Sequence, residues 1–425
     1  MQNKNALQAL FVANTISGFA QGISMIGIPW YFVDVLNKPS EFAYIYSVVT
    51  LVSMIWSLYA GTLNDRYDRK YLFVFENIIG ACILFIVSGW AYYTNSTPIE
   101  MLILVFASIF FLYNIHYPAL YAFVQEISEP KHYNKLTSYL EIQGQLTSAL
   151  AGGMAAIMLN GYSGKPLLTL FNYDIVLPFT FEAWPLKSIF LLNAIAFVIA
   201  LLTVNSIKYK AVAVRKIEKA PVFKQLATGF SFLQQHKLLL LFGVVSLFVF
   251  ATTMMLTFVL MPNYTKNVLN ASANTFALGE LYFALGSIGA GLVAIIIFGR
   301  NPVLGNILLA VLSGSAFIVL SFNKSEFIFY IAIALLGLGN AGSRIMRITY
   351  LLQHVPNSVV GRTQSIYSLA NYINRFLFIQ LFALPFFVNN VDWAFVICSI
   401  WCLIAAILLL IYYNRLQNLN ISTNH

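Results

Sequence analysis

Three ionisable residues, Glu280, Arg375 and His116, stand inside long apolar runs of the sequence. A charged side chain at the centre of a bilayer is costly, so such residues are functional candidates by default. A carboxyl such as Glu280 can take up and release a proton when its surroundings alternate, whereas Arg375 stays charged and can pair with Glu280 or hold an anionic substrate group. The sequence therefore predicts Glu280 as a proton carrier, Arg375 as its partner and His116 as a second proton candidate.

Each of these residues also has a purely structural interpretation. Glu280 can belong to a structural ion pair or be a hydrogen-bonded carboxyl, and His116 can be a buried histidine satisfied by its neighbours. Two further acids, Asp34 and Glu76, lie near the ends of apolar runs. We expect both to be solvated rather than to take part in coupling.

Other kinds of chemistry lack a matching motif. The sequence has no G-x-x-x-x-G-K-[ST] loop, so we expect no ATP-driven motor in this chain. It has no nucleophile constellation and no metal cluster, and its three cysteines fall in apolar runs, where free Cys behaves as a small hydrophobe. A membrane-embedded enzyme would need an acid/base pair at one membrane face, which we do not find. We therefore expect no enzyme activity, no cofactor and no metal. Beside a transporter and an enzyme, a channel is the third class of function, and accumulation of a substrate driven by a proton gradient would exclude it.

The elements that must position these residues are membrane spans. Of the 425 residues, 60% are hydrophobic and only 9% are charged, against about a quarter in soluble domains. Spans of about 20 apolar residues cross the hydrocarbon core, and the sequence predicts twelve of them. Their ranges are 10–33, 42–60, 72–93, 101–124, 136–159, 186–204, 238–261, 275–298, 303–322, 327–352, 363–388 and 393–413.

The distribution of basic residues predicts the orientation. With the N-terminus inside, eighteen of the 24 Lys and Arg residues fall in inner segments and five in outer loops, and Arg375 lies within a span. This asymmetry places both termini in the cytoplasm. Because the basic residues are scattered among loops rather than gathered on one face, they do not indicate nucleic-acid binding. The expected partners are a small-molecule substrate, protons and the lipid bilayer.

The longest inner connection divides the chain into halves. We expect an N-terminal bundle over 1–205, a cytoplasmic linker over 206–237 and a C-terminal bundle with a short tail over 238–425. Within the linker, apolar residues recur at helical spacing among polar ones, which predicts an amphipathic helix on the inner membrane face. These residues are Phe223, Leu226, Phe230 and Leu233.

A charged loop between the second and third spans carries a longer pattern. It reads G-x-x-x-D-R-x-x-R-K, with Gly61, Asp65, Arg66, Arg69 and Lys70 at the specified positions. The pattern, at this place in a chain of this layout, resembles the signature loop of the major facilitator superfamily of transporters. The resemblance implies an all-α membrane protein with twelve transmembrane helices in two pseudo-symmetric six-helix bundles.

The same resemblance implies roles for residues at the inner gate. Glu126, near the cytoplasmic end of the fourth span, is expected to meet Arg66 or Arg69. Asp65 is expected to face the start of the eleventh span near Gly361 and Arg362.

Two stretches resemble one branch of the superfamily, the enterobactin-exporter and macrolide-efflux-like proteins. They are the linker segment 223–237 and Tyr117-Pro118-Ala119 near the end of the fourth span. Together with the ionisable residues inside spans and the missing nucleotide loop, this layout predicts proton-coupled export of an amphipathic small molecule by alternating access, in a monomer of the plasma (bacterial inner) membrane. Exporters of the superfamily often carry a Gly-Pro kink in the fifth span, and here Ser148 to Gly153 has the glycines without the proline. Import on the same fold therefore stays open as the alternative.

Aromatic residues are the candidates for the substrate cavity. A bulky, partly apolar substrate suits an aromatic lining, for which we select Trp30, Tyr31, Tyr113 and Tyr282. The long outer loop 161–185 is also rich in aromatic residues. We expect it to lie at the outer membrane interface, with a substrate flap as the alternative.

Overall fold

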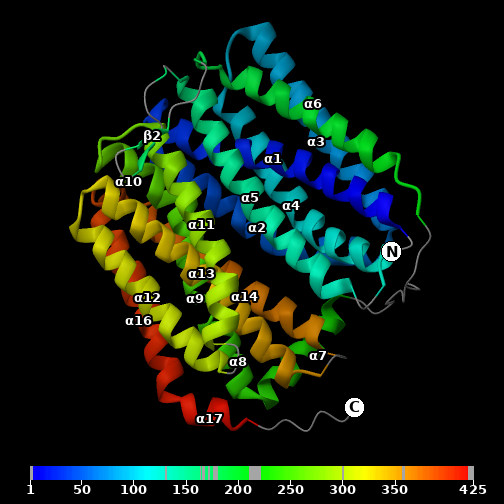
Figure 1. The fold of residues 1–425 in the computed structure, drawn as a ribbon, viewed down its shortest axis with the longest axis vertical. Helices are drawn as coiled ribbons and strands as arrows, with labels where there is room; N and C mark the ends of the chain where they lie inside the picture. Colours follow the sequence, from blue (N-terminus) through cyan, green and yellow to red (C-terminus); the bar gives the residue numbers. More distant parts are fainter. Residues whose placement is uncertain are drawn as a thin grey trace. The chain divides into compact units, whose positions relative to one another are not determined.

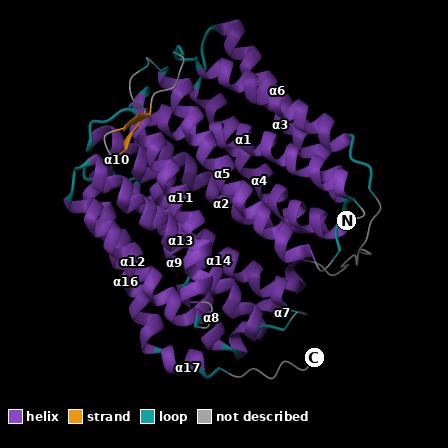
Figure 2. Ribbon diagram, in the orientation of Figure 1, coloured by secondary structure: helices purple, strands orange, loops and turns teal. Residues whose placement is uncertain are grey.

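The computed structural model describes residues 3–129, 132–162, 164, 168–170, 173–175, 180–209, 222–298, 301–356 and 359–419. Some side chains within the helices lie outside this description, among them those of Gly61, Asp65, Arg66 and Gly361. Helices make up nearly all of the described chain (Figure 2).

The first half of the chain forms six long helices and a short hairpin (Figure 1). The helices are α1 (Lys4–Asp34), α2 (Pro39–Arg66), α3 (Arg69–Thr94), α4 (Ile99–Ile127), α5 (Tyr133–Asn160) and α6 (Leu186–Asn205). The strands are β1 (Leu168–Leu170) and β2 (Tyr173–Ile175).

The rest of the chain is helical, with several short segments. These are α7 (Val222–Gln235), α8 (Lys237–Val245), α9 (Phe248–Met255), the π-helical turn η2 (Leu256–Leu260), α10 (Met261–Asn267), α11 (Ala273–Phe298), α12 (Pro302–Phe322), α13 (Glu326–His354), α14 (Val360–Phe382), α15 (Pro385–Asn389), α16 (Val391–Ile411) and α17 (Tyr413–Gln417).

The predicted spans are confirmed as helices. Among the described residues, ten helical segments are long and apolar enough to cross a membrane, with α8 to α10 counted together as Lys237–Asn267. The remaining two predicted spans are α11 and α14, which have 26 and 23 residues. The helix α7 occupies the part of the linker where the sequence predicts an amphipathic helix.

The hairpin is an element that the sequence analysis did not expect. Strands β1 and β2 pair antiparallel, with Leu168 opposite Ile175, inside the loop predicted to be an aromatic interface segment. A second antiparallel bridge joins Tyr162 to Phe181 at the two ends of this loop. Tyr, Ile and Thr favour extended backbone, so a loop this rich in such residues can form a local sheet.

The seventh span is interrupted twice. A turn at Ser246 and Leu247 separates α8 from α9, and η2 follows α9. Pro262 has no N–H to continue the α-helical pattern, and the N–H of Met261 bonds to Leu256 O across five residues. At the first interruption, Ser343 Oγ and Arg347 Nη1 donate to Ser246 O over 3.3 and 3.4 Å. The broken backbone is therefore satisfied by side chains of α13.

The chain forms two compact units. Unit 1 consists of Met1–Val35, Ile55–Glu218 and Ala271–Leu278, and unit 2 of Leu36–Met54, Lys219–Asn270 and Gly279–His425. In unit 1, α1 packs against α5 and α6, and α3 packs against α4 and α6. In unit 2, α12 packs against α13 and α16, and α14 packs against α7 and α9.

Within unit 2, helices α11 and α13 approach each other through two glycines. A Cβ on Gly286 would collide with Ala334 O, and a Cβ on Gly337 would collide with Phe283 O. Ser287 Oγ also donates to Gly337 O over 3.2 Å. Small residues permit such close packing of membrane helices.

We expect Gly286→Ala to destabilise the protein. Alanine favours an isolated helix by about 1 kcal/mol over glycine, but a collision with a backbone carbonyl forces helix displacement, and overpacking costs roughly 1–3 kcal/mol. Gly289→Ala in the same helix is the matched control, because a Cβ there meets nothing within 4 Å. Thermal unfolding in detergent should show a lower Tm for Gly286→Ala alone; equal Tm values for the two variants would contradict the packing described here.

Candidate functional site

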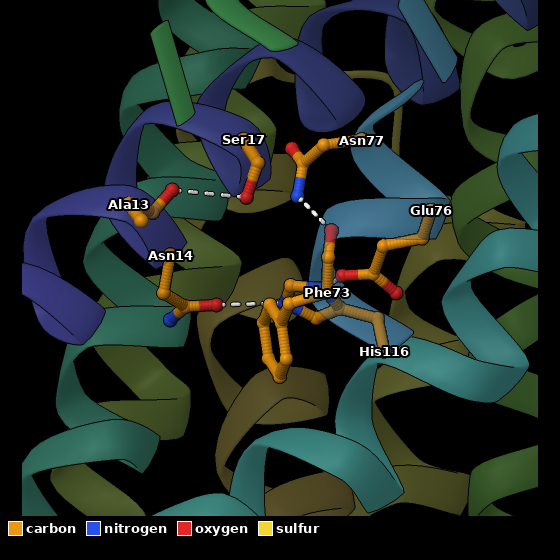
Figure 3. A network of polar contacts seen from close by, with 7 residues as sticks. All are labelled: Ala13, Asn14, Ser17, Phe73, Glu76, Asn77 and His116. Atoms are coloured by element: carbon orange, nitrogen blue, oxygen red, sulfur yellow. Dashed lines mark hydrogen bonds and ion pairs between the residues drawn. The ribbon is translucent and has the colours of Figure 1, made fainter. Parts of the chain in front are cut away.

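A buried hydrogen-bond network joins helices α1, α3 and α4 in unit 1. Glu76 Oε1 lies 2.6 Å from His116 Nδ1, and His116 Nε2 lies 2.7 Å from Asn14 Oδ1. Glu76 and His116 are each 1% exposed and Asn14 is 8% exposed. Figure 3 shows the His116 ring between the Glu76 carboxylate and the Asn14 amide. The network thus places two titratable groups side by side away from solvent.

The network extends to α5 and ends on the backbone of α1, and this end determines which nitrogen of His116 carries a proton. Gln143 Nε2 donates to Phe11 O over 2.6 Å and also to Thr15 Oγ1. Because Phe11 O can only accept, the other end of the Gln143 amide, Oε1, must be the acceptor for Asn14 Nδ2 at 3.0 Å. Asn14 therefore presents its oxygen to the imidazole, and His116 Nε2 carries a proton.

The neighbouring groups leave one carboxylate oxygen without a donor. Asn77 Nδ2 donates to Phe73 O over 2.6 Å, and Ser17 Oγ donates to Ala13 O over 3.0 Å (Figure 3). The Phe73 ring packs edge-on against the imidazole with centroids 5.0 Å apart. In the part of the chain that the structure describes, Glu76 Oε2 has no hydrogen-bond partner.

This geometry lets the Glu76–His116 pair hold one exchangeable proton. With one proton between Nδ1 and Oε1 the pair is neutral overall, as carboxylate with imidazolium or as carboxylic acid with imidazole. Without this proton the pair is negative, and the carboxylate faces the Nδ1 lone pair at 2.6 Å. With a second proton between them, the pair is positive. Either change leaves an uncompensated buried charge, which costs about 3–5 kcal/mol.

The expectation that Glu76 is solvated is therefore wrong. The predicted span begins at residue 72, but α3 begins at Arg69, so Glu76 lies about two turns into the helix. It belongs to the buried face of α3, with Leu72, Phe73 and Gly80 at helical spacing. That spacing is present in the sequence and was the signal that could have placed Glu76 inside. His116, the second proton candidate, lies at the centre of the network.

Glu280 and Arg375 do not form the expected pair. Glu280 is 5% exposed, and its Oε1 has no hydrogen-bond partner among the described residues. Arg375 instead donates from Nη2 to Tyr46 Oη, with its guanidinium 5.6 Å from the ring centroid of Tyr46 and 5.7 Å from that of Tyr372. A guanidinium over aromatic faces is stabilised by cation–π attraction, and this contact takes the place of the predicted carboxylate.

A polar cluster surrounds the start of α3. Arg69 Nη1 lies 3.8 Å from Glu126 Oε2, at the end of α4. Lys70 Nζ donates to Asn205 O and Ile207 O, each over 2.8 Å. These carbonyls belong to the C-terminal end of α6, where a cation is favoured by the unsatisfied carbonyls and the helix dipole.

Tyr209 completes this cluster, and the sequence analysis did not select it. Its Oη lies 3.0 Å from Glu126 Oε1 and 3.3 Å from Asp68 Oδ2, and can donate to either. Burial, and then the Glu126 and Asp68 carboxylates, raise the pKa of the Tyr209 phenol above its ordinary value. The phenol therefore keeps the proton that it donates. A tyrosine just after the last apolar run of the first half carries no distinctive signal in the sequence.

Two of the four aromatic cavity candidates line the same cavity. Trp30 and Tyr31 both border it at the C-terminal end of α1, and Trp30 also stacks on Phe276 with centroids 5.1 Å apart. Tyr113 packs on Tyr117 with centroids 4.4 Å apart. In unit 2, Tyr282 stacks on Tyr330 with centroids 5.0 Å apart.

A family model described as Major Facilitator Superfamily matches residues 10–379. The chain belongs to the major facilitator superfamily. A search of curated proteins with the sequence finds no match.

Solved structures of superfamily transporters resemble the fold. A mutant of the nucleoside transporter NupG superposes with a TM-score of 0.70 at 13% identity, over 96% of this chain and 100% of its own. A bacterial homologue of the iron transporter ferroportin, in an inward-facing state, superposes with a TM-score of 0.67 at 13% identity, over 97% of this chain and 99% of its own. An auto-inhibited peptide transporter of the POT family superposes with a TM-score of 0.68 at 11% identity, over 99% of this chain and 98% of its own. At these identities the likeness extends to the fold alone.

The superfamily signature loop can be followed in part. The predicted contact of Glu126 with Arg69 is present. The side chains of Gly61, Asp65, Arg66 and Gly361 lie outside the described part of the chain, so the gate contact proposed for Asp65 stays a prediction. The backbone of Arg362 lies against Gly229 of α7, where a Cβ would meet the Arg362 carbonyl group.

We expect the hydrogen bond from Tyr209 to Glu126 to couple the linker to the signature loop. A double-mutant cycle with Tyr209→Phe and Glu126→Gln should give a coupling energy of about 1 kcal/mol, because a hydrogen bond to a charged group is stronger than a neutral one but this cluster is partly solvated. Thermal unfolding of the four variants measures it. Tyr93→Phe, whose side chain is 90% exposed, is the control and should not couple to Glu126→Gln. Strict additivity of the Tyr209 and Glu126 substitutions would contradict the contact.

Proposed function

We propose that the chain is a proton-coupled secondary transporter for a small organic molecule, with Glu76 and His116 as its proton-binding pair. It works by alternating access in the plasma membrane, the inner membrane of a bacterium, with both termini in the cytoplasm. Membership of the major facilitator superfamily supports transport as the general function.

The observation that carries the proton coupling is the buried contact between Glu76 and His116. Removing or adding one proton leaves a charge that its present surroundings do not compensate. A difference of about 3–5 kcal/mol between two arrangements corresponds to roughly two to four powers of ten in their ratio. Protonation of this pair can therefore bias the equilibrium between two conformations of the transporter.

Glu280 is the second candidate for the proton carrier. It is buried in α11, and its Oε1 lacks a partner among the described residues. It has no neighbouring histidine or cation in the described contacts to compensate its charge, whereas Glu76 has His116. We therefore assign the coupling proton to the pair in unit 1 and leave Arg375, held by Tyr46, as a candidate for an anionic substrate group.

Export of an amphipathic molecule is the direction that we propose. Its support is the resemblance of the linker helix and of Tyr117-Pro118-Ala119 to the macrolide-efflux-like branch. Import is the second candidate, because α5 runs from Tyr133 to Asn160 without the proline that many exporters carry there.

We expect Glu76→Gln to abolish uphill transport driven by a pH gradient and to preserve substrate exchange, since the amide keeps the shape of the carboxyl but cannot exchange the proton. His116→Asn should have the same effect. The measurement uses purified protein in liposomes with ethidium as an amphipathic probe, together with compounds that raise its Tm. Accumulation should fall at least tenfold while exchange stays within twofold of the parent protein.

Two carboxylates serve as controls. Glu100→Gln, at the exposed start of α4, should leave accumulation unchanged. Glu280→Gln should also keep it. Loss of accumulation in Glu280→Gln with wild-type behaviour of Glu76→Gln would transfer the proton site to α11 and overturn our assignment.

A further inference from the structure

Arg347 is a buried cation at the broken seventh span of unit 2. Helix α13 packs against α8 and α9, the two segments that the turn at Ser246 and Leu247 separates (Figure 1). Arg347 is 8% exposed, and its Nη1 donates to Ser246 O over 3.4 Å. The residue lies seven positions before His354, where α13 ends, which corresponds to about 10 Å at the rise of an α-helix. The guanidinium is therefore well inside the apolar segment rather than at its end.

No carboxylate compensates this charge in the part of the chain that the structure describes. The ion pairs there do not include Arg347. The charge that acts on it is that of Arg344, one turn earlier on α13, and this charge is also positive. The carbonyl of Ser246 lies at the end of a helix, where the partial charges amount to about half an elementary charge. A buried charge without a full counter-charge is costly, so a negatively charged group bound here would be stabilised.

One edge of the guanidinium stays open. Nη1 is used by Ser246 O, whereas Nε and Nη2 are not among the buried polar atoms without a partner in the described chain, and no hydrogen bond covers them there. Both atoms therefore keep accessible surface. Their N–H groups point in the same direction from the planar guanidinium, and such a fork matches the two oxygen atoms of a carboxylate or phosphate.

The broken backbone by itself does not require an arginine. Ser343 Oγ lies 3.3 Å from the same Ser246 O and is a neutral donor. A neutral amide in place of Arg347 could supply a second donor. A permanent charge inside a membrane helix is costly enough to be a functional candidate by default, so the charge itself indicates an electrostatic role.

We propose that Arg347 binds the carboxylate or phosphate group of a small anion through the open Nε–Nη2 edge of its guanidinium. The bond from Nη1 to Ser246 O orients this fork, and the positive charge of Arg344 adds to the attraction. The site lies in unit 2 and is defined by equilibrium binding without a pH gradient. Its test is therefore separate from that of the proton pair in unit 1, and either proposal can fail without the other.

Benzoate and benzamide are a matched pair of probes, because they have nearly the same shape and only benzoate is charged. We expect benzoate and phenyl phosphate to raise the Tm of the purified full chain in detergent, as ligands of the folded state do. Both anions should bind at least tenfold more tightly than benzamide. Binding of the anions no tighter than that of benzamide would overturn the proposal.

Substitutions locate the anion at Arg347. Arg347→Gln should bind benzoate and benzamide equally. Arg347→Lys keeps the charge but has no fork, and should weaken benzoate binding at least threefold; it covers the case in which Arg347→Gln fails to fold. Ser343→Ala, at the same carbonyl, and Arg415→Gln, exposed in α17, are the controls and should keep the preference. A preference that persists in Arg347→Gln, or that is lost equally in the controls, would contradict the site.

The anion can come from solution or from the phosphate of a lipid headgroup. Native mass spectrometry of the full chain with phosphatidylglycerol distinguishes the two sources. Displacement of the bound lipid by phenyl phosphate, in the parent protein but not in Arg347→Gln, identifies the headgroup as the occupant. Binding of phenyl phosphate without displacement of lipid identifies a soluble anion.

Discussion

The contact of Glu76 Oε1 with His116 Nδ1, at 2.6 Å among buried side chains, is the interaction on which this account depends. A carboxyl in such a place must be neutral or compensated, and among the residues that the structure describes the imidazole of His116 is the group placed to compensate it. The imidazole is in turn fixed by Asn14, and Asn14 by Gln143 and the backbone of α1. Four helices thus share one proton position, and a change of protonation acts on the packing of all four.

The cluster at the start of α3 connects this unit to the linker. Lys70 bonds to the carbonyls that end α6, and Tyr209, a few residues later, lies between the carboxylates of Asp68 and Glu126. Glu76 is six residues beyond Lys70 along the same helix. A displacement of α3 that accompanies protonation would therefore reach the linker directly through a rigid helix. This is a physical route of coupling that contains no long chain of intermediate side chains.

The spans could be predicted from the sequence because the length of an apolar run is set by membrane thickness alone. Residues such as His116 could be selected for the same reason, since a polar group in such a run needs an explanation. Pairings could not be predicted. Glu280 and Arg375 have opposite charges and both lie in apolar runs, but they do not form an ion pair, because Arg375 is held by Tyr46 from α2. Glu76 was predicted to be solvated because span ends estimated from hydropathy fall a few residues inside the true helix ends. Tyr209 was not selected because its role depends on which helix ends lie together in the fold.

The most direct test of the central claim is ¹⁵N nuclear magnetic resonance of the His116 imidazole. The chain has five histidines, so the four others are replaced first: His132, His236, His354 and His425. We predict that Nε2 carries a proton throughout and that the ¹⁵N shift of Nδ1, which reports both its protonation and its hydrogen bond with Glu76, changes over the pH range in which transport changes. An imidazole with a bare Nε2, or one whose Nδ1 shift stays the same while transport changes, would contradict the account.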